Sequence, residues 1–349
     1  MTAGATQPAV RATLEDVARA AGVSLATVDR VVNRREGVRA KTVARVEAAV
    51  AKLGYRGDVA AARLARGQTF RFAFVLPSGS NSFMTNLAEQ VQRTADWLAG
   101  QRAFIDVIQV DVFDPDELAG ALERLPAAYH GLATVALDHP RVRAAIDDLV
   151  ARNVSVVTLV SDAPSSRRMH YVGIDNPAAG RTAATLMGRF LSGCKGPVGV
   201  IAGSLSLRDH AERQFGFHQI LSSEYPDLTA LPALEGRDDR ERTRGLTAEL
   251  LKRHPDLLGI YSAGAGNRGI AAALEEAGRA REVVWVAHEL THHTRRFLLH
   301  GTIDAIINQD PGHEARSAAR ILLAHCWAEP IILDQERIRI DIFLRDNLP

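Results

Sequence analysis

The sequence predicts an α/β protein that begins with a small helical unit, and two observations support this prediction. From residue 70 onward, apolar runs alternate with helical stretches, and the alternation occurs in two successive series. Residues 13–33 instead have the pattern of two short helices joined by a glycine turn. Because regular alternation of strands and helices is typical of parallel sheets covered by helices, we expect a helix-turn-helix unit followed by two doubly wound parallel α/β lobes.

The ends of the two short helices are marked by capping residues. Thr13 can cap the exposed backbone amides of the first helix, and Asp16 places negative charge in its first turn, where the helix dipole favours it. Gly22 can take the left-handed conformation that ends a helix. Ser24 is then expected to cap the second helix, residues 25–32.

The second helix has one apolar face and one exposed face. The inward face is predicted to hold Val28, Val31 and Val32. The outward face is predicted to hold Leu25, Ala26, Asp29 and Arg30. This is the layout of a helix-turn-helix, in which the second helix lies in the major groove of DNA. The alternative is an ordinary hairpin of two amphipathic helices.

Two further helical segments follow. Residues 41–53 would complete a three-helix core and end at Gly54, with apolar side chains at helical spacing at Val43, Val46, Ala49, Val50 and Leu53. Residues 58–66 are alanine-rich, are capped by Asp58 and are too short for a stable isolated helix. From the residues alone, the alternative is a plain linker.

The charge of the chain is distributed unevenly. The net charge of +1 arises from 42 Lys or Arg and 41 Asp or Glu. Residues 1–68 hold 12 basic and 6 acidic residues, a balance of +6, which leaves 30 and 35 for the remainder, a balance of −5. The basic charge of residues 1–68 favours phosphate binding by this segment, whereas the acidic remainder does not favour it.

Composition also limits the classes of protein to which the chain can belong. An apolar content of 46% over 349 residues suits a globular chain of two or three domains. Cys194 and Cys326 lie far apart without metal-ligand spacing, which predicts reduced thiols. The first twelve residues lack the apolar core of a signal peptide, and no run of about 18 apolar residues could span a membrane. We therefore expect a disordered tail over residues 1–12 and a cytoplasmic protein without membrane contact.

The predicted strands form two groups. The first comprises residues 70–76, 104–110, 131–137 and 154–160. After about Asp175, the second comprises residues 197–203, 257–263, 282–287 and 303–308. Two such lobes form a cleft at the carboxyl ends of their strands, where a small ligand would bind.

Three runs of sequence resemble the LacI/GalR family of bacterial regulators: DVARAAGVSLATVDRVVN, KTVARVEAAVAKLGY and AARLARGQT, at residues 16–33, 41–55 and 61–69. The resemblance implies a DNA-binding domain over residues 13–56, a hinge helix over residues 57–69 and an effector sensor of the periplasmic-binding-protein type I fold over residues 70–349. It implies a homodimer on operator DNA, with Leu64 inserted into the minor groove and Val59 near the dimer axis.

The exposed face and the resemblance together predict the DNA contacts. Arg30 is the best candidate for bidentate readout of guanine, and Leu25 and Ala26 match specificity-setting positions of the family. Phosphate contacts are expected from Ser24, Thr27, Asn33 and Lys41. Asp29 departs from the usual serine, and its carboxylate should repel phosphate unless it accepts from cytosine N4 or orients Arg30 or Asn33.

Candidate effector residues follow the predicted strands. Carboxylates, amides and an arginine can hold vicinal hydroxyls, and an aromatic face can stack on a sugar ring. The predicted set is Asn81, Phe83, Asp138, Asp175, Arg213, Asn267, Glu289 and Gln309. Asp175 has an alternative role as a helix cap. Asn267 stands in GAGNRG, where family members often carry an Asn-Asp pair, so its contact is either shifted or lost. The expected effector is a sugar or polyol.

Two motifs offer an enzymatic alternative. Gly264, Gly266 and Gly269 spell the G-x-G-x-x-G of dinucleotide binding, and His288, Glu289 and His292 spell the H-E-x-x-H of zinc hydrolases. The glycines fall late in the second lobe, and a strand before His288 with a cap at Thr291 would place the two histidines across a loop. We therefore assign no cofactor, metal or catalytic residue. A transport binding protein would need an export signal and would lack residues 13–66.

Overall fold

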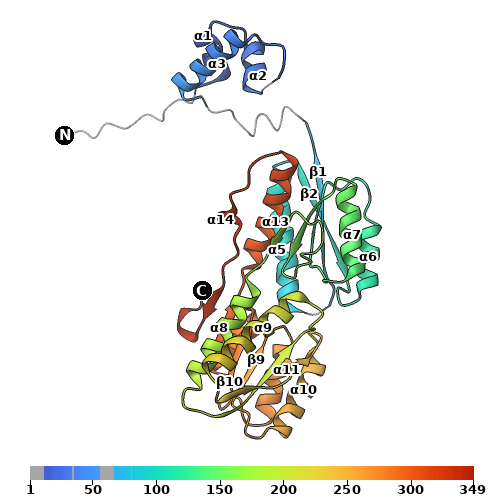
Figure 1. The fold of residues 1–349 in the computed structure, drawn as a ribbon, viewed down its shortest axis with the longest axis vertical. Coiled ribbons are helices and arrows are strands. Elements are labelled where there is room, and N and C mark those ends of the chain that lie inside the picture. Colours follow the sequence, from blue (N-terminus) through green and yellow to red (C-terminus); the bar gives the residue numbers. More distant parts are fainter. Residues whose placement is uncertain (1–11, 34, 56–66, 80) are drawn as a thin grey trace, which may run out of the picture. The chain divides into compact units, whose positions relative to one another are not determined.

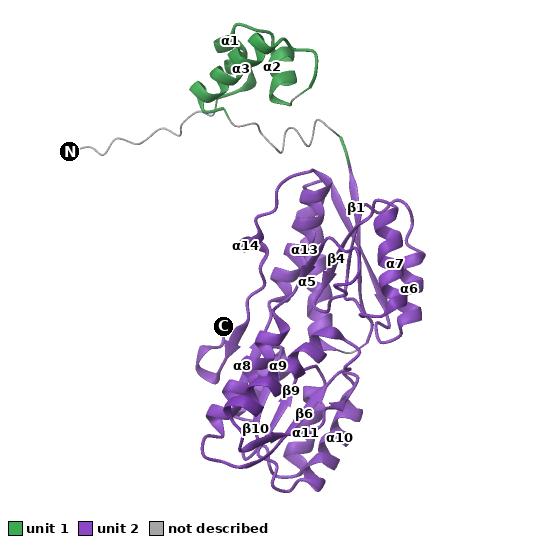
Figure 2. Ribbon diagram, viewed as in Figure 1, with its two compact units in different colours: residues 1–68 green, residues 69–349 purple. Residues whose placement is uncertain are grey.

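The computed structural model describes residues 12–33, 35–55, 67–79 and 81–349. The chain separates into two compact units, residues 1–68 and residues 69–349 (Figure 1, Figure 2). The smaller unit is helical over its described residues, and the larger one is α/β. None of the described helices combines the length and the apolar character that crossing a membrane requires.

Three helices pack around a small apolar core in the first unit. They are α1 (Leu14–Ala21), α2 (Leu25–Val32) and α3 (Ala40–Leu53). Val17, Val28 and Val46 supply one fully buried side chain from each helix. The predicted three-helix arrangement is therefore confirmed.

Local signals determine where these helices begin and end. The Thr13 hydroxyl accepts from the Asp16 backbone amide at 3.2 Å, while the Asp16 carboxylate accepts from the Thr13 amide at 2.9 Å. This reciprocal pair is a capping box. Gly22 ends α1 with a φ of 61°, a left-handed conformation that glycine adopts without steric cost. Ser24 caps α2 by accepting from the Thr27 amide.

Two predictions about this core are wrong. Val32 was expected inside but is 36% exposed, because Val31 and Val32 lie on opposite sides of Val28 around the helix and the core lies on the side of Val31. Leu53 is 37% exposed at the last turn of α3. Residues 57–66 of the predicted hinge helix, with Val59 and Leu64, and residues 1–11 of the predicted tail lie outside the described residues.

The first lobe of the larger unit is a five-stranded parallel sheet in the order β2-β1-β3-β4-β5. The strands are β1 (Phe70–Pro77), β2 (Ala103–Val110), β3 (Gly131–Thr134), β4 (Ser155–Leu159) and β5 (His170–Val172). The helices are α5 (Ser82–Ala99), α6 (Pro115–Glu123), α7 (Pro140–Ala151) and α13 (Pro311–Cys326). Phe72 and Phe74 of β1 pack with α5 and α13, whereas Ala73 and Val75 pack with α6 and α7. The sheet is thus covered on both faces (Figure 1).

The second lobe has a larger sheet in the order β12-β11-β10-β9-β6-β7, with β8 also paired to β6. Its strands are β6 (Gly196–Ala202), β7 (Leu228–Ala230), β8 (Leu234–Glu235), β9 (Gly259–Ser262), β10 (Val284–His288), β11 (Ala305–Asn308) and β12 (Asp341–Phe343). Only β12 is antiparallel among these described strands. The helices α8 (Asn176–Phe190) and α9 (Arg208–Glu224) pack on one face. The other face carries α10 (Arg240–Arg253), α11 (Asn267–Glu276) and α12 (His292–His300).

The chain passes between the two lobes at three places: from β5 to α8, from β11 to α13, and from α14 (Leu333–Glu336) to β12. Glu336 of α14 is held on the first lobe, because its carboxylate accepts from Arg320 of α13 at 2.6 Å. A short 3-10 helix (Arg345–Asn347) then ends the described chain near β12. Loops at the carboxyl ends of both parallel sheets line one common cavity.

Candidate functional site

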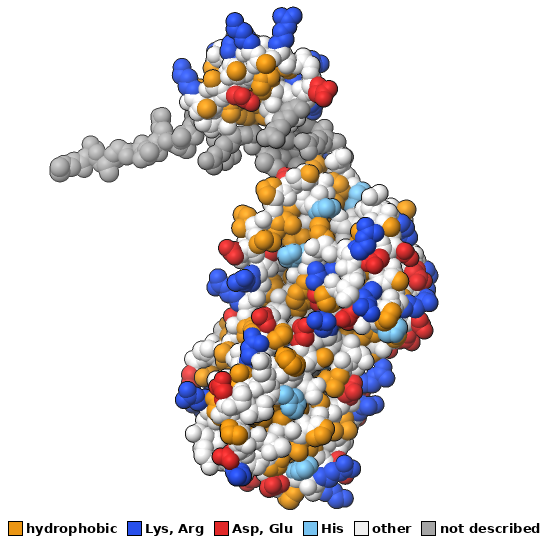
Figure 3. All heavy atoms as spheres, in the orientation of Figure 1, with side chains coloured by type: hydrophobic (Ala, Val, Ile, Leu, Met, Phe, Trp, Pro, Cys, Tyr) orange, Lys and Arg blue, Asp and Glu red, His pale blue; other side chains and the backbone are white. Residues whose placement is uncertain are grey.

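The exposed side of α2 presents the residues that the sequence assigned to DNA. Leu25 is 46% exposed, and Ala26, Arg30 and Lys41 are also exposed. Ser24 and Thr27 share a hydrogen bond of 2.9 Å between their hydroxyls. On the face drawn in Figure 3, Lys and Arg side chains stand on the surface of this unit. Apolar and basic side chains are thus both exposed on α2, and Lys41 is exposed at the start of α3.

The Asp29 carboxylate accepts hydrogen bonds from other side chains of the helical unit. Its carboxylate accepts from the Asn33 side-chain amide at 2.7 Å and from Arg35 at 3.2 Å. Of the two intramolecular roles that the sequence left open, the structure shows the contact with Asn33 and no contact with Arg30 within the described residues. Arg35 is a further partner that sequence reasoning missed. The ion pair with Arg35 offsets the negative charge of Asp29.

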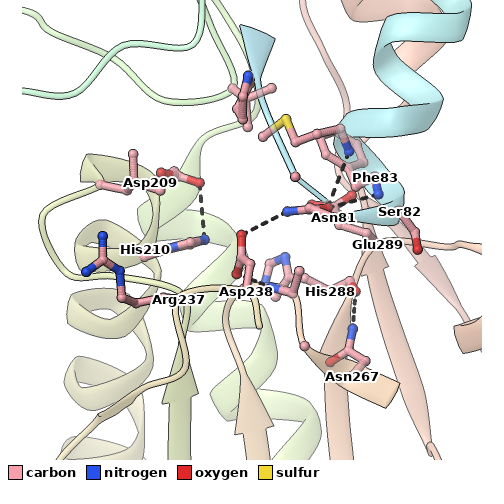
Figure 4. A pocket seen from close by; sticks show the side chains of 18 of the residues that line it. Asn81, Ser82, Phe83, Asp209, His210, Arg237, Asp238, Asn267, His288 and Glu289 are labelled. Carbon is pink, nitrogen blue, oxygen red and sulfur yellow. Dashed lines mark hydrogen bonds and ion pairs between the residues drawn. The ribbon is translucent and has the colours of Figure 1, made fainter. Parts of the chain in front are cut away.

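The second candidate site is a cavity of about 260 Å³ in the larger unit, lined by residues of both lobes (Figure 4). Arg213 of α9 lines the cavity and is 2% exposed. Its Nε donates to the Asn176 side chain at 2.8 Å, and its Nη1 donates to the Ala263 carbonyl at 2.9 Å. Its Nη2 lies 3.6 Å from Glu289 and makes no hydrogen bond with the described residues. The cavity therefore contains a fixed cationic donor with an unused hydrogen.

Glu289 follows β10 with a left-handed φ of 68° and turns its carboxyl group toward Arg213. Gln309 donates to Glu289 Oε1 at 2.8 Å. Burial raises the pKa of Glu289 to about 7, and the Arg213 guanidinium opposes this shift. Glu289 Oε2 and Gln309 Oε1 have no hydrogen-bond partner among the described residues. Both are acceptors that a ligand hydroxyl could satisfy.

Three contacts join the lobes around the cavity. Asn81 caps α5 through its side-chain oxygen and donates its side-chain amide to Asp238 of the second lobe at 2.8 Å (Figure 4). The Arg237 guanidinium lies 5.5 Å from the centre of the Phe113 ring. Arg208 of α9 pairs with Asp138 of the first lobe at 3.2 Å. The residues of the first two contacts line the cavity, whereas Arg208 and Asp138 do not.

Most of the predicted effector residues line this cavity. Those that do are Asn81, Phe83, Arg213, Asn267, Glu289 and Gln309. Asp138 does not, because its carboxylate is taken up by Arg208 and Arg143. Asp175 is exposed and caps α8 by accepting from the Ala178 amide at 2.8 Å, which is the alternative role that the sequence allowed.

Asn267 reaches the cavity, but both ends of its amide are used inside the protein. Its oxygen accepts from the Ser262 hydroxyl at 2.8 Å, and its nitrogen donates to the His288 carbonyl at 3.2 Å. Trp285 in turn donates to Ser262 at 3.0 Å. Of the two alternatives for GAGNRG, this arrangement favours the loss of a ligand contact at Asn267.

Sequence reasoning missed several residues of the cavity wall, including Ser161, Asp209, His210, Arg237, Asp238 and His288. Arg237 and Asp238 have consecutive left-handed φ angles of 51° and 56°, which no local signal indicates for these residue types. Asp209 stands beside the predicted Arg213 on α9, so helical spacing could have found it.

The H-E-x-x-H motif lacks the geometry that zinc chemistry needs. His288 ends β10 and is fully buried, whereas His292 is the exposed first residue of α12. The two side chains therefore do not share a helical face, and within the described ranges no group of three or more metal-ligating side chains gathers. Gly269 permits close packing of α10 on α11, since a Cβ there would lie 2.2 Å from the Arg240 carbonyl. Gly266 makes a left-handed turn with a φ of 90°.

Known protein families match both units of the chain. The family described as "Bacterial regulatory proteins, lacI family" matches residues 13–58, and the family described as "Periplasmic binding protein domain" matches residues 72–329. The sucrose operon repressor of Streptococcus mutans serotype c is 30% identical over 212 residues, which cover 60% of this chain and 62% of that protein. The match thus spans less than two thirds of that relative.

Two further proteins extend the comparison. The HTH-type transcriptional regulator DegA of Bacillus subtilis is 26% identical over 275 residues, or 78% of each chain. The glucose-galactose binding protein GanP of Geobacillus stearothermophilus is similar in structure over 81% of this chain and 99% of its own, with a TM-score of 0.72 at 24% identity. That structural similarity shows the fold of the larger unit.

The fold and the cavity define a two-lobed protein of the periplasmic-binding-protein class that carries a helix-turn-helix unit ahead of its first lobe. The chain belongs to the family of periplasmic binding protein domains, whose match spans residues 72–329, and its residues 13–58 match the lacI family of bacterial regulatory proteins. The fold class expected from the sequence is thereby confirmed.

Proposed function

We propose that the protein is a transcriptional repressor whose affinity for an operator is controlled by a sugar or polyol in the cavity between its lobes. One observation carries the proposal: a helix-turn-helix unit and a cavity with unused buried hydrogen-bonding groups occur on one chain. The relatives named above are described as a repressor and a transcriptional regulator, which supports the same function.

The chemistry of the cavity favours a polyhydroxylated ligand. Its unpartnered buried atoms include acceptors on Asp209, Glu289 and Gln309 and a donor on Arg213. Hydroxyl groups both donate and accept, so neighbouring hydroxyls of one ligand can satisfy donors and acceptors together. The Phe83 ring in the wall supplies an apolar surface for the C–H face of a sugar ring. A buried polar group left without a partner costs about 1 to 3 kcal/mol, so a ligand that completes these bonds gains affinity.

On DNA, two copies of the chain would place α2 of each copy in successive major grooves, with the hinge helices in the minor groove between them. In this arrangement Arg30 reads guanine, Leu25 and Ala26 contact neighbouring base edges, and Leu64 is the minor-groove wedge. Phosphate contacts would come from Ser24, Thr27, Asn33 and Lys41.

The edge of the first lobe supports pairing of two copies. Strand β2 is an edge strand, and Phe104 on it is 50% exposed. Trp97 of α5, which packs beside β2, is 47% exposed. Large apolar side chains at an open sheet edge favour burial against a second copy.

The test uses the full chain in two stages. Selection from random duplexes should yield a short inverted repeat bound with a Kd of about 10 nM or tighter. Titration of that complex with a panel of sugars and polyols should then change DNA affinity by about 5- to 150-fold for one of them. Sedimentation should show a dimer on DNA.

Specific results would contradict the proposal. Binding without sequence preference would reject the operator function. A purine or nucleotide that acts where all sugars fail would reject the proposed effector class. Stoichiometric zinc or a copurified nicotinamide cofactor would favour the enzymatic alternative.

A further inference from the structure

His288 has an unused ring nitrogen at the wall of the cavity. It is fully buried at the end of β10, it lines the cavity, and its Nε2 lies 2.9 Å from the hydroxyl of Tyr261 on the neighbouring strand β9. Its Nδ1 is buried and has no hydrogen-bond partner among the described residues. Such an atom in a native protein calls for a partner from a ligand or from water.

The surroundings hold His288 in one position. The Asn267 amide donates to its backbone carbonyl, and the chain of hydrogen bonds from Trp285 through Ser262 to Asn267 leaves no member unpaired. Tyr261, whose hydroxyl contacts Nε2, stacks its ring on that of Phe217, with 4.4 Å between ring centres. A fully satisfied buried network of this kind makes a side chain rigid.

The hydrogen bond with Tyr261 decides which nitrogen carries the proton. Burial raises the pKa of Tyr261 and lowers the pKa of His288 well below its ordinary value, and nearby Arg213 and His210 lower the pKa of His288 further. Tyr261 therefore keeps its hydrogen, and His288 is neutral with one N–H. If Nε2 held that hydrogen, the buried Tyr261 hydrogen would have no acceptor. The tautomer that pairs both groups has Tyr261 donating to Nε2 and the hydrogen on Nδ1.

We propose that His288 is a specificity-determining residue that donates a hydrogen bond from Nδ1 to an acceptor oxygen of the effector, and that Tyr261 is the positioning residue that fixes this tautomer. The inference rests on the proposed function, because it deepens the chemistry of the same cavity.

The proposal narrows the class of ligand. Glu289 and Asp209 offer acceptors and so require hydroxyl donors, whereas His288 offers a neutral donor and requires an oxygen with a free lone pair. A sugar supplies both in one molecule, through its hydroxyls and its ring or carbonyl oxygen. A ligand whose oxygen at this position is replaced by CH₂ would leave the His288 donor unpaired, and we expect it to bind about tenfold more weakly.

Amide side chains provide the variants. The amide of His288→Asn lies where Nδ1 lies, whereas the amide of His288→Gln lies where Nε2 lies. We expect His288→Asn to bind the effector within about threefold of the wild type, and His288→Gln and His288→Leu to bind about tenfold more weakly. His292→Asn is the matched control, because His292 belongs to the same HELTH segment but is exposed and does not line the cavity. Isothermal titration of the full chain with the active sugar measures each affinity.

A second measurement begins without effector and needs no stable variant of His288. In wild-type protein with ¹⁵N-labelled histidine, long-range ¹H–¹⁵N spectra distinguish a protonated ring nitrogen from an unprotonated one. The spectrum should show His288 protonated at Nδ1, and Tyr261→Phe should convert it to a mixture of tautomers. Addition of the active sugar should shift the Nδ1 resonance.

The possible failures are distinguishable. If the spectra show the proton on Nε2, the inference is overturned whatever binds. If a sugar binds the wild type, His288→Asn and His288→Leu with equal affinity, the inference is overturned while the proposed function stands. If no sugar or polyol binds the wild type, the proposed effector class fails, and the tautomer measurement alone decides whether His288 presents the donor.

Discussion

The two candidate sites of this protein hold their polar side chains in opposite states. Arg30 on α2 and Lys41 at the start of α3 are exposed, so water hydrates their charges when no DNA is present. In the cavity, Arg213 and Glu289 are buried, and each keeps at least one polar atom without a hydrogen-bond partner among the described residues. The DNA-binding face is therefore stable without its ligand, whereas the cavity carries an energetic cost that a ligand can relieve.

This difference indicates at which residues a substitution changes both the stability of the fold and the binding of a ligand. Substitution of an exposed group removes a contact with the ligand and leaves the fold almost unchanged. Substitution of a buried charged group changes both ligand binding and the stability of the fold, because its neighbours lose their own partners. The following substitutions test this distinction, beginning with the largest expected effect.

Arg213→Met should destabilise the larger unit strongly. The substitution keeps an apolar stem of similar length but removes the donor to Asn176 and Ala263 and the charge beside Glu289. Loss of one member of a buried charged cluster costs about 3 to 5 kcal/mol. Urea denaturation should show this loss, and sugar binding should disappear. Arg253→Met is the control, because the exposed ion pair of Arg253 with Glu249 contributes little. Equal stability of the two variants would contradict the structural role of Arg213.

Glu289 should make stability depend on pH. Its pKa is raised from 4.5 to about 7, so the folded state binds the proton more tightly than the unfolded state. The contribution of Glu289 to stability is fully present below about pH 4.5 and is lost as the pH rises through about 7. Relative to Glu289→Gln, the wild type should lose about 3 kcal/mol over this range, at about 1.4 kcal/mol per pKa unit. Parallel pH profiles of the two proteins in urea denaturation would show that Glu289 is not the titrating group.

Arg30→Ala should act on DNA binding alone. Loss of a bidentate contact to guanine costs about 1 to 3 kcal/mol and weakens discrimination at one base step. Lys41→Ala, which removes a proposed phosphate contact, should weaken binding to all sequences alike. Gel-shift titration with the selected operator and with single-base variants distinguishes these patterns. Both variants should unfold at the same urea concentration as the wild type, and unchanged operator affinity in Arg30→Ala would reject its assignment.

Asp29→Asn should have the smallest effect and should increase binding to non-specific DNA. The substitution removes a negative charge from the exposed face and frees Arg35 from its ion pair of 3.2 Å. One additional phosphate contact by Arg35 would steepen the dependence of log K on log salt by about 0.9. Anisotropy titrations over a range of salt concentrations measure this slope. A slope equal to that of the wild type would mean that Arg35 does not reach the phosphates.

The sequence by itself determined the elements whose causes are local. Thr13, Gly22 and Ser24 marked the ends of α1 and the start of α2, and the structure confirms all three. The eight predicted strands are present in two parallel sheets, because long apolar runs bounded by turns have few other conformations. The short strands β5, β7, β8 and β12 were not predicted, because two or three residues carry no period and become strands only through pairing.

Tertiary structure alone decided which polar side chains are available to a ligand. Asn81 and Asp238 are 157 residues apart, yet they share a hydrogen bond across the cavity. Asp138 and Asn267 have the right residue types after the right strands, but Arg208 of the other lobe occupies one carboxylate oxygen of Asp138, and Ser262 and His288 occupy the amide of Asn267. Asp175 is instead used locally, as the cap of α8. Hydrogen bonds are short and directional, so the state of each donor and acceptor depends on residues that only folding brings near. His288 shows the converse, because folding pairs its Nε2 with Tyr261 and leaves its Nδ1 unpaired at the cavity wall.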